Sequence, residues 1–300
     1  MYDVIVIGGS YAGMAATLQL LRARRSVLVI DAGERRNRFA SHSHGFLGQD
    51  GVPPSEIAAT ARHQLGAYPT LRWMEDRAKS VSGQADAFTV TTASGSSHSS
   101  RRILLATGVV DWLPTIDGLA DRWGTAVFHC PYCHGYELNQ GRIGIVGTGP
   151  MSAHQAELLT DWGEVTLFVN NALELAPEAR ATLARRGIAI EDAPINRIEG
   201  HADVVLEDGR VQAFAGLFVA TRTVPSNLLA QTIGCAMEDV PTGVQIRTDT
   251  EGKTTVPGIF ACGDVAHFPH TVSLAVGNGA LTGAQVHRSL LWPETIAPRA

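Results

Sequence analysis

The sequence is poor in charged and aromatic residues and has no long run of basic or apolar side chains. Charged residues make up 18% of its 300 positions and aromatic residues 6%, and the formal net charge is -5. No basic run is longer than Arg24-Arg25 or Arg35-Arg36, which argues against nucleic-acid binding. No apolar run reaches transmembrane length. We therefore expect a globular protein with neither nucleic acid nor membrane as its partner.

A basic leader and a dense cysteine framework are also missing. Met1–Ile7 lacks a positively charged segment and runs directly into glycines, so it predicts a strand and not a signal peptide. A cytoplasmic, reducing location is the resulting expectation. In that setting four cysteines rarely form structural bridges, and a closely spaced pair is more often redox-active or metal-binding.

One such pair is present, at Cys130 and Cys133, with His134 directly behind it. A CxxC setting can lower the pKa of the first thiol, and the thiolate is the reactive species. The spacing alone leaves three alternatives: c-type haem attachment, half of a zinc site, or two packed cysteines. Haem attachment normally needs export. Cys235 and Cys262 have no partner spacing, which argues against a four-thiolate zinc site, and we expect no metal.

The N-terminal segment has the order of a βαβ nucleotide-binding unit. A buried strand over 4–7 is followed by a glycine turn, a helix over 14–24, a strand over 26–30 and the acid Asp31. The turn consists of Gly8, Gly9, Ser10, Tyr11, Ala12 and Gly13. Its glycines allow the backbone to approach a pyrophosphate, and Asp31 can accept hydrogen bonds from a ribose. Ser10 stands where a second glycine is usual, so the fingerprint is imperfect.

A second unit of the same kind follows the cysteine pair. A strand over 143–146 leads into the turn Gly147–Ser152, then a helix over 153–162 and a strand over 165–169. The position that usually selects the ribose holds Asn170-Asn171. There is thus no arginine in place for a 2′-phosphate and no acid for a plain ribose.

The remaining elements are less specific. We expect a helix over 56–64, a polar loop over 35–51, a hairpin tip over 94–100, a linker over 111–114, a helix ending at 187, a final helix over 273–291, and strands over 71–74, 88–92, 103–108, 188–190, 204–206, 216–220, 244–246 and 255–262. The strand before Gly263-Asp264 delivers a carboxylate that could bind a ribityl or phosphate-linked hydroxyl.

In order, these motifs resemble the low-molecular-weight thioredoxin reductases, which are FAD-dependent pyridine nucleotide-disulfide oxidoreductases. The resemblance covers essentially the whole chain. It implies an α/β fold with two Rossmann-like dinucleotide-binding domains, the second inserted into the first. The FAD-binding domain would span 1–113 and 245–300, and the NAD(P)-binding-like domain that carries the cysteines would span 114–244. A homodimer is also implied.

The same resemblance assigns candidate ligands. For FAD they are Gly8, Gly9, Ser10, Tyr11, Ala12, Gly13, Asp31, Ala32, Gly33, Arg38, His44, Ala106, Thr107, Gly108, Gly263, Asp264, Thr271 and Val272. For NADP(H), whose binding we expect to be weak, they are Gly147, Gly149 and Met151. Three positions depart from the reductases: His134 replaces an acid, Val169-Asn170-Asn171 replaces His-Arg-Arg, and His270-Thr271-Val272 replaces Arg-Gln-Ala.

The stretch Cys130–Glu137 is instead similar to the branch that contains the dithiol oxidases of gliotoxin and holomycin biosynthesis. That branch implies oxidation of a small-molecule dithiol with dioxygen as acceptor. Cys130 would be attacked by substrate, Cys133 would pass electrons to FAD, and His134, titrating near neutral pH, would move protons. The alternatives are an NADPH-dependent disulfide reductase of thioredoxin-reductase type, with a protein disulfide as substrate, and a non-enzymatic redox sensor.

Overall fold

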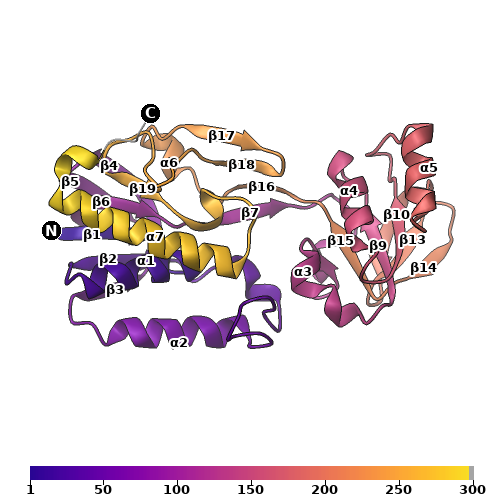
Figure 1. Ribbon diagram of the computed structural model, residues 1–300, viewed down its shortest axis with the longest axis horizontal. Helices are drawn as coiled ribbons and strands as arrows, with labels where there is room; N and C mark the ends of the chain where they lie inside the picture. Colours follow the sequence, from indigo (N-terminus) through magenta and orange to yellow (C-terminus); the bar gives the residue numbers. More distant parts are fainter. Residues whose placement is uncertain (297–300) are drawn as a thin grey trace.

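The structure is a computed structural model that describes residues 1–296. It has two bodies, which are joined by two paired strands that run from one body to the other (Figure 1). We call the larger one, with both chain ends, the first body, and the smaller one, with the cysteine pair, the second body. Both are mixed α/β structures, as the sequence predicts.

The first body is built on a seven-stranded sheet of order β3-β2-β1-β6-β5-β4, with β19 paired to β6. Its strands are β1 (Tyr2–Ile7), β2 (Val27–Asp31), β3 (Leu71–Glu75), β4 (Ala78–Gln84), β5 (Ala87–Thr92), β6 (Ser97–Leu105) and β19 (Ile259–Ala261). β1, β2, β3, β6 and β19 are parallel, whereas β5 pairs antiparallel with both β6 and β4. The carboxyl ends of the parallel strands therefore meet at one edge of the sheet.

Helices cover both faces of this sheet. They are α1 (Tyr11–Arg22), α2 (Pro54–Gly66), α6 (Leu229–Thr232) and α7 (Val272–Leu291), with short 3-10 turns η1 (Arg36–Phe39), η4 (Gly263–Val265) and η5 (Pro293–Thr295). α1 and α7 lie side by side (Figure 1). A Cβ on Gly279 of α7 would lie 2.2 Å from the Ala12 carbonyl oxygen, so this glycine allows the two helices to pack closely.

The second body is built on a parallel sheet of order β11-β10-β9-β15-β8. Its elements are β8 (Val127–Phe128), β9 (Arg142–Val146), β10 (Glu164–Phe168), β11 (Ala189–Glu191) and β15 (Gly216–Val219), with α3 (Pro131–His134), α4 (Pro150–Leu159), α5 (Pro177–Arg185), η2 (Ala120–Arg122) and η3 (Tyr136–Leu138). A small antiparallel sheet of β12 (Ile195–Glu199), β13 (Asp203–Leu206) and β14 (Val211–Ala213) packs beside it.

Two strands cross between the bodies. β7 (Val109–Trp112) pairs antiparallel with β16 (Arg222–Pro225), and β18 (Gly243–Ile246) and β17 (Met237–Val240) extend them into a four-stranded sheet. The expected linker over 111–114 is thus partly wrong, because Asp111 and Trp112 complete a strand. The chain passes the junction once in each direction, and the two passing segments satisfy their backbone groups by pairing.

The return of the chain into the first body comes before residue 245. Leu229, Cys235 and Ile246 pack in the same hydrophobic core as Ile5 of β1. We therefore propose that the second body spans about residues 113–221, in place of the expected 114–244.

The predicted strands and helices are otherwise present, with ends shifted by a few residues. Val4–Ile7 is buried on both faces, as expected for a central parallel strand. The predicted hairpin tip over 94–100 is wrong in its second half, because Ser97–Ser100 belongs to β6 and pairs with β5. Neighbouring strands overrode the weak strand propensity of these serines. Within residues 1–296 no helix is long and apolar enough to cross a membrane.

Candidate functional site

The glycine turn between β1 and α1 is shaped by close backbone contacts. Gly8 has a φ of 103°, and a Cβ there would lie 2.2 Å from the Ala106 carbonyl oxygen. The Gly9 amide donates a hydrogen bond of 3.0 Å to Asp31 at the end of β2. The predicted turn and its acid are thus in direct contact, as the order of the βαβ unit requires.

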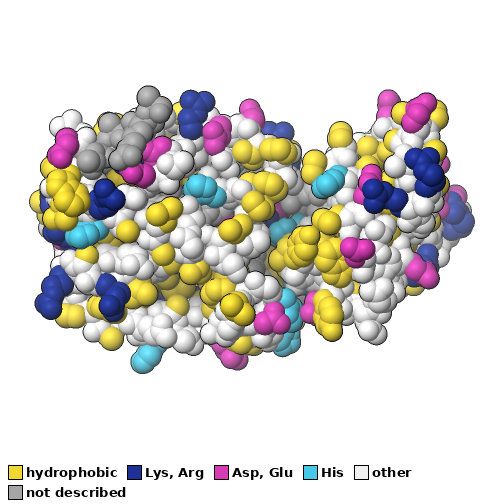
Figure 2. All heavy atoms as spheres, in the orientation of Figure 1, with side chains coloured by type: hydrophobic (Ala, Val, Ile, Leu, Met, Phe, Trp, Pro, Cys, Tyr) yellow, Lys and Arg dark blue, Asp and Glu magenta, His cyan; other side chains and the backbone are white. Residues whose placement is uncertain are grey.

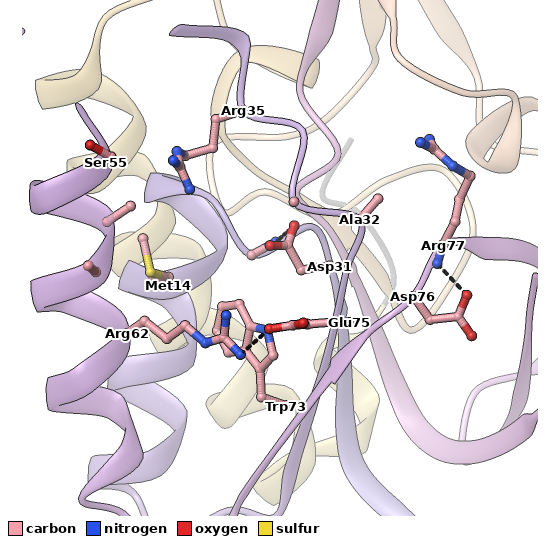
Figure 3. Close-up of a pocket in the computed structure, with 14 residues that line it drawn as sticks. Met14, Asp31, Ala32, Arg35, Ser55, Arg62, Trp73, Glu75, Asp76 and Arg77 are labelled. Carbon is pink, nitrogen blue, oxygen red and sulfur yellow. Dashed lines mark hydrogen bonds and ion pairs between the residues drawn. The ribbon is translucent and has the colours of Figure 1, made fainter. Parts of the chain in front are cut away.

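A cavity of about 460 Å³ opens beside this turn (Figure 3). It is lined by Gly9, Met14, Asp31, Ala32, Gly33, Arg35, Ser55, Ala58, Ala59, Arg62, Trp73, Glu75, Asp76 and Arg77. Among the described residues, Arg35 Nε and Trp73 Nε1 are buried donors without a hydrogen-bond partner. A cavity that combines a glycine turn, a carboxylate and two unused donors fits the adenosine end of a dinucleotide such as FAD.

Sequence reasoning missed the wall of this cavity that β3 provides. Arg62 of α2 donates to Glu75 at 2.6 Å, and its guanidinium lies 4.8 Å from the centre of the Trp73 ring. Figure 3 shows this group closing one side of the cavity. No local sequence pattern marked this wall, because β3 lies beside β2 only in the folded sheet, where parallel strands end at the same edge.

The other predicted FAD segments reach the same edge. The Gly263 amide donates to Asn278 at 2.7 Å, and Asp264 accepts a hydrogen bond of 3.2 Å from Arg36. The Thr107 carbonyl accepts one of 2.7 Å from Ser226. Because β6 and β19 are parallel neighbours, the segments that follow them lie side by side. The structure therefore brings together 8–13, 106–108 and 263–264.

Other predicted ligands are used differently in this structure. Arg38 does not line the cavity, and its guanidinium lies 4.2 Å from the centre of the Phe39 ring. Thr271 caps α7 by accepting a hydrogen bond from the Leu274 amide, and Val272 begins that helix. Their assignment to FAD stays a prediction.

The cysteine pair is closed as a disulfide, with Cα atoms 5.3 Å apart. Cys130 caps the one-turn helix α3, and Cys133 lies within it. Both side chains are partly buried, so exposure does not distinguish which one a substrate would attack. Tyr132 packs edge-on against Trp162, and Gln155 of α4 donates to the His129 carbonyl at 2.9 Å. These contacts hold the disulfide segment on the second body.

The same segment also touches the first body. His44 Nε2 lies 3.4 Å from a carboxylate oxygen of Glu137, and Gly45 lies beside the Tyr132 carbonyl. Figure 2 shows the surface hollowed between the two bodies and hydrophobic side chains gathered over α3 at that hollow. Tyr132, which stands between the two cysteines in the chain, and the nearby Tyr136 are 70% and 86% exposed. A substrate could thus reach the disulfide from an apolar rim.

The pKa of His134 differs from the value that the sequence led us to expect. Its ring stacks on Phe128 with centroids 4.3 Å apart. Burial, with a smaller effect from the charge of His44, lowers the pKa of His134 to about 4. The expectation that this imidazole titrates near neutral pH is therefore corrected: it is neutral there and can only accept a proton. The adjacent His129 has its pKa lowered to about 3, first by burial and then by Arg36.

In the second nucleotide unit the glycine turn is preserved but the ribose-selecting position is not charged. Gly147 packs against the Phe168 carbonyl, and Gly149 has a φ of 152°. Met151 is 39% exposed at the start of α4. Asn170 and Asn171 both adopt left-handed backbone, with φ of 50° and 53°. Asn170 also accepts a hydrogen bond of 3.0 Å from the Ile195 amide, so its side chain already has a structural role.

The two arginines that could replace the missing charge are engaged elsewhere. Arg185 donates to Thr182 at 2.9 Å, and Arg186 lies 3.1 Å from Glu157. In residues 1–296 there is also no group of three or more His, Cys, Asp or Glu side chains placed to hold a metal.

Comparison with known proteins agrees with this geometry. Residues 2–279 match the family of pyridine nucleotide-disulphide oxidoreductases. A protein named thioredoxin reductase tcpT, from Claviceps purpurea, is 31% identical over 96% of this chain and 94% of its own length. An oxidoreductase from Agrobacterium tumefaciens has a crystal structure that aligns with a TM-score of 0.95 and 54% identity, over 97% of this chain and 99% of its own. The structure of HlmI aligns with a TM-score of 0.89 and 35% identity, over 97% and 92%.

The fold, together with a CxxC disulfide on the second body, defines a sulfur-directed oxidoreductase with two dinucleotide-binding domains. The chain belongs to the pyridine nucleotide-disulphide oxidoreductase family and is thioredoxin-reductase-like. The expected cofactor class is confirmed at the level of this family, whose members bind FAD and use NADPH as electron donor.

Proposed function

We propose that this protein oxidises a small-molecule dithiol to a disulfide through Cys130 and Cys133, with dioxygen as the final acceptor. The observation that carries the proposal is the left-handed Asn170-Asn171 turn, where the Asn170 side chain is used by the backbone. Arginine holds a 2′-phosphate through charge-assisted hydrogen bonds, which are stronger than the neutral ones that asparagine offers. Electrons then enter from a thiol more readily than from NADPH.

The first half of the reaction is a pair of thiol–disulfide exchanges. A substrate thiolate attacks Cys130, the Cys130–Cys133 bond breaks, and Cys133 leaves as a thiolate. The second substrate thiolate attacks the substrate sulfur of the mixed disulfide, which releases Cys130 and the cyclic product. Two electrons have then moved from the substrate to the cysteine pair, and two protons have left the substrate.

We propose that His134, which follows Cys133 directly, accepts one of these protons; its pKa of about 4 makes the imidazole a weak base, so the proton passes on to solvent. The residues at the carboxyl edge of the first sheet would hold FAD: Gly8–Gly13 and Asp31 at one end, and Gly263-Asp264 further along. When bound there, FAD supplies the two-electron acceptor that reoxidises the cysteines and passes the electrons to dioxygen. The overall change is dithiol plus dioxygen to disulfide plus hydrogen peroxide.

The experiment is anaerobic mixing of the purified holoenzyme with dithiothreitol, NADPH or NADH in turn, with the flavin absorbance recorded. We expect fast bleaching by the dithiol, and peroxide when air is admitted. Cys133→Ser is the matched control and should abolish bleaching by the dithiol. Fast bleaching by NADPH with none by dithiothreitol would overturn the proposal.

That second result would favour an NADPH-dependent disulfide reductase. Two observations support this alternative: the retained glycine turn at Gly147 and Gly149, and the name of the Claviceps purpurea relative, thioredoxin reductase tcpT. A protein disulfide would then be the substrate, and the same experiment separates the two directions of electron flow.

We also propose that the protein is a homodimer that uses the outer face of α7. This face carries an exposed stripe with alternating spacings of three and four residues: Leu274, Gly277, Leu281, Ala284, Arg288 and Leu291. A mostly apolar stripe on an otherwise packed helix is typical of a helix contact between subunits. Light scattering of Leu281→Glu should give a monomer, whereas a dimer of unchanged strength would remove this face from the interface.

A further inference from the structure

A buried carboxylate ties together the junction between the two bodies. Asp111 of β7 has a side chain only 5% exposed. It accepts hydrogen bonds of 2.8 and 2.6 Å from Arg36 Nε and Nη2, and one of 2.7 Å from Thr221 Oγ1. Arg36 belongs to η1 of the first body, and Thr221 lies between β15 of the second body and β16. One side chain at the crossing is therefore bound from both sides.

Arg36 extends this network into the dinucleotide site. Its Nη1 donates to Asp264 at 3.2 Å, and its side chain is 17% exposed. Burial alone would lower the pKa of Arg36, but Asp111 and Asp264 outweigh it and raise the pKa. Burial would likewise raise the pKa of Asp111, and the hydrogen bonds and charge of Arg36 reverse this. The pair is thus an ion pair at neutral pH.

The geometry of this pair restricts rotation. A guanidinium that gives two parallel hydrogen bonds to one carboxylate fixes both the distance and the plane of its partner. The crossing consists of two short strands, β7 and β16, and β7 lies at the edge of its four-stranded sheet. A second contact between the bodies is made by His44 of the first body, whose Nε2 lies 3.4 Å from a carboxylate oxygen of Glu137 of the second. The junction thus has two sets of contacts that share no residue.

We propose that Asp111 is a positioning residue for the redox pair: with Arg36 and Thr221, it sets the angle between the bodies and keeps the Cys130–Cys133 disulfide against the first body. This inference goes beyond the proposed function, because it holds for any thiol substrate and either direction of electron flow. The hydrogen-bond donors to the Asp111 carboxylate are Arg36 and Thr221, and neither is a cysteine of the redox pair. Asp111 therefore acts on the disulfide through the orientation of the whole second body.

The test is a distance measurement between the bodies of the FAD-loaded protein. Spin labels are attached at Lys79→Cys on β4 and Glu207→Cys beside β13, both exposed, with Cys130–Cys133 kept oxidised. Cys235 and Cys262 are buried and should not be labelled. The distance distribution is recorded for the labelled parent, for Asp111→Asn and for Thr221→Val. Thr182→Val, whose hydroxyl serves only its own helix and Arg185, is the matched control.

We expect one narrow distribution in the parent and in Thr182→Val. Loss of the Thr221 hydrogen bond to a charged acceptor should raise the population of other arrangements about ten- to hundredfold, and Asp111→Asn should broaden the distribution more. FAD content should be unchanged in Thr221→Val, while flavin reduction by dithiothreitol slows. Distributions that superimpose on the parent in both variants would overturn the inference.

Thr221→Val alone decides the outcome if Asp111→Asn does not fold, because it removes a single hydroxyl. The distance readout needs no turnover. A protein that fails to oxidise dithiols but shows the expected broadening would refute the proposed function and leave this inference standing.

Discussion

Lowering the pH should reduce the free energy of unfolding of this protein, in part through His134. Replacing His134 should remove that part of the pH dependence. The pKa of His134 is lowered to about 4 by burial, with a smaller contribution from His44. In the unfolded chain the imidazole has an ordinary pKa of about 6.5. Below that pH the unfolded chain binds a proton at this position and the folded chain does not. Lowering the pH from 6.5 towards 4 therefore favours unfolding, and the contribution is constant above pH 7.

The size of the effect follows from the two pKa values. Between pH 7 and pH 5, a shift from about 6.5 to about 4 corresponds to roughly 1.8 kcal/mol of unfolding free energy. The His134 side chain is partly exposed, and solvent screens part of this cost, so we expect a loss of about 1 kcal/mol. His129 acts in the same direction, because burial, and then the charge of Arg36, lowers its pKa to about 3.

Urea unfolding of the holoenzyme at pH 7 and pH 5 provides the assay. His134→Gln keeps a polar side chain of similar size but cannot be protonated. The wild type should lose about 1 kcal/mol more than this variant between the two pH values. His63→Gln, on the exposed face of α2, is the control and should behave as the wild type. Equal losses in the wild type and His134→Gln would refute the assigned pKa and, with it, the neutral state of this imidazole.

Three further results are expected. Gly9→Ala should reduce the amount of FAD released on denaturation, because the added Cβ would lie 2.5 Å from the Trp73 ring. The control Gly66→Ala, whose Cβ would meet open space, should release as much FAD as the wild type. Equal FAD in the two variants would contradict the assigned site. NADPH should reduce the flavin slowly and with little preference over NADH. Losing one or two charged contacts to the 2′-phosphate weakens NADPH binding by about ten- to ten-thousand-fold. Rapid reduction by NADPH with NADH inert would count against this prediction. His134→Ala should slow reduction by dithiothreitol by roughly ten- to a thousandfold with unchanged FAD content, and an unchanged rate would return His134 to a structural role.

The sequence predicted the parts of the fold that local pattern controls. Val4–Ile7 is a continuous apolar run followed by two glycines, and such a run is typical of a central strand of a parallel sheet. The crossing strands were not predicted as a pair. β7 and β16 are short, 110 residues apart and half-exposed, so neither has a hydrophobic period that marks it as a strand. Their pairing depends on the relative position of the two bodies, and a local sequence pattern does not predict that position.

The site shows the same division. The glycine turn, Asp31 and the cysteine pair were identified because their chemistry requires fixed spacings along the chain. Trp73 and Arg62 were missed because they meet only through the register of β3 and the facing side of α2. The state of His134 was also misjudged, since a pKa near 4 results from burial against Phe128, and burial of a single residue cannot be read from its neighbours in sequence.

The Asn170-Asn171 turn links the backbone of the second body to its chemistry. After β10 the chain reverses through two consecutive left-handed residues, a conformation that asparagine tolerates better than arginine. The Asn170 side chain then satisfies the Ile195 amide at the start of β12. An arginine here would strain the turn and leave that amide without its acceptor. The residues that stabilise this loop therefore leave no arginine at the ribose-selecting position of the second body.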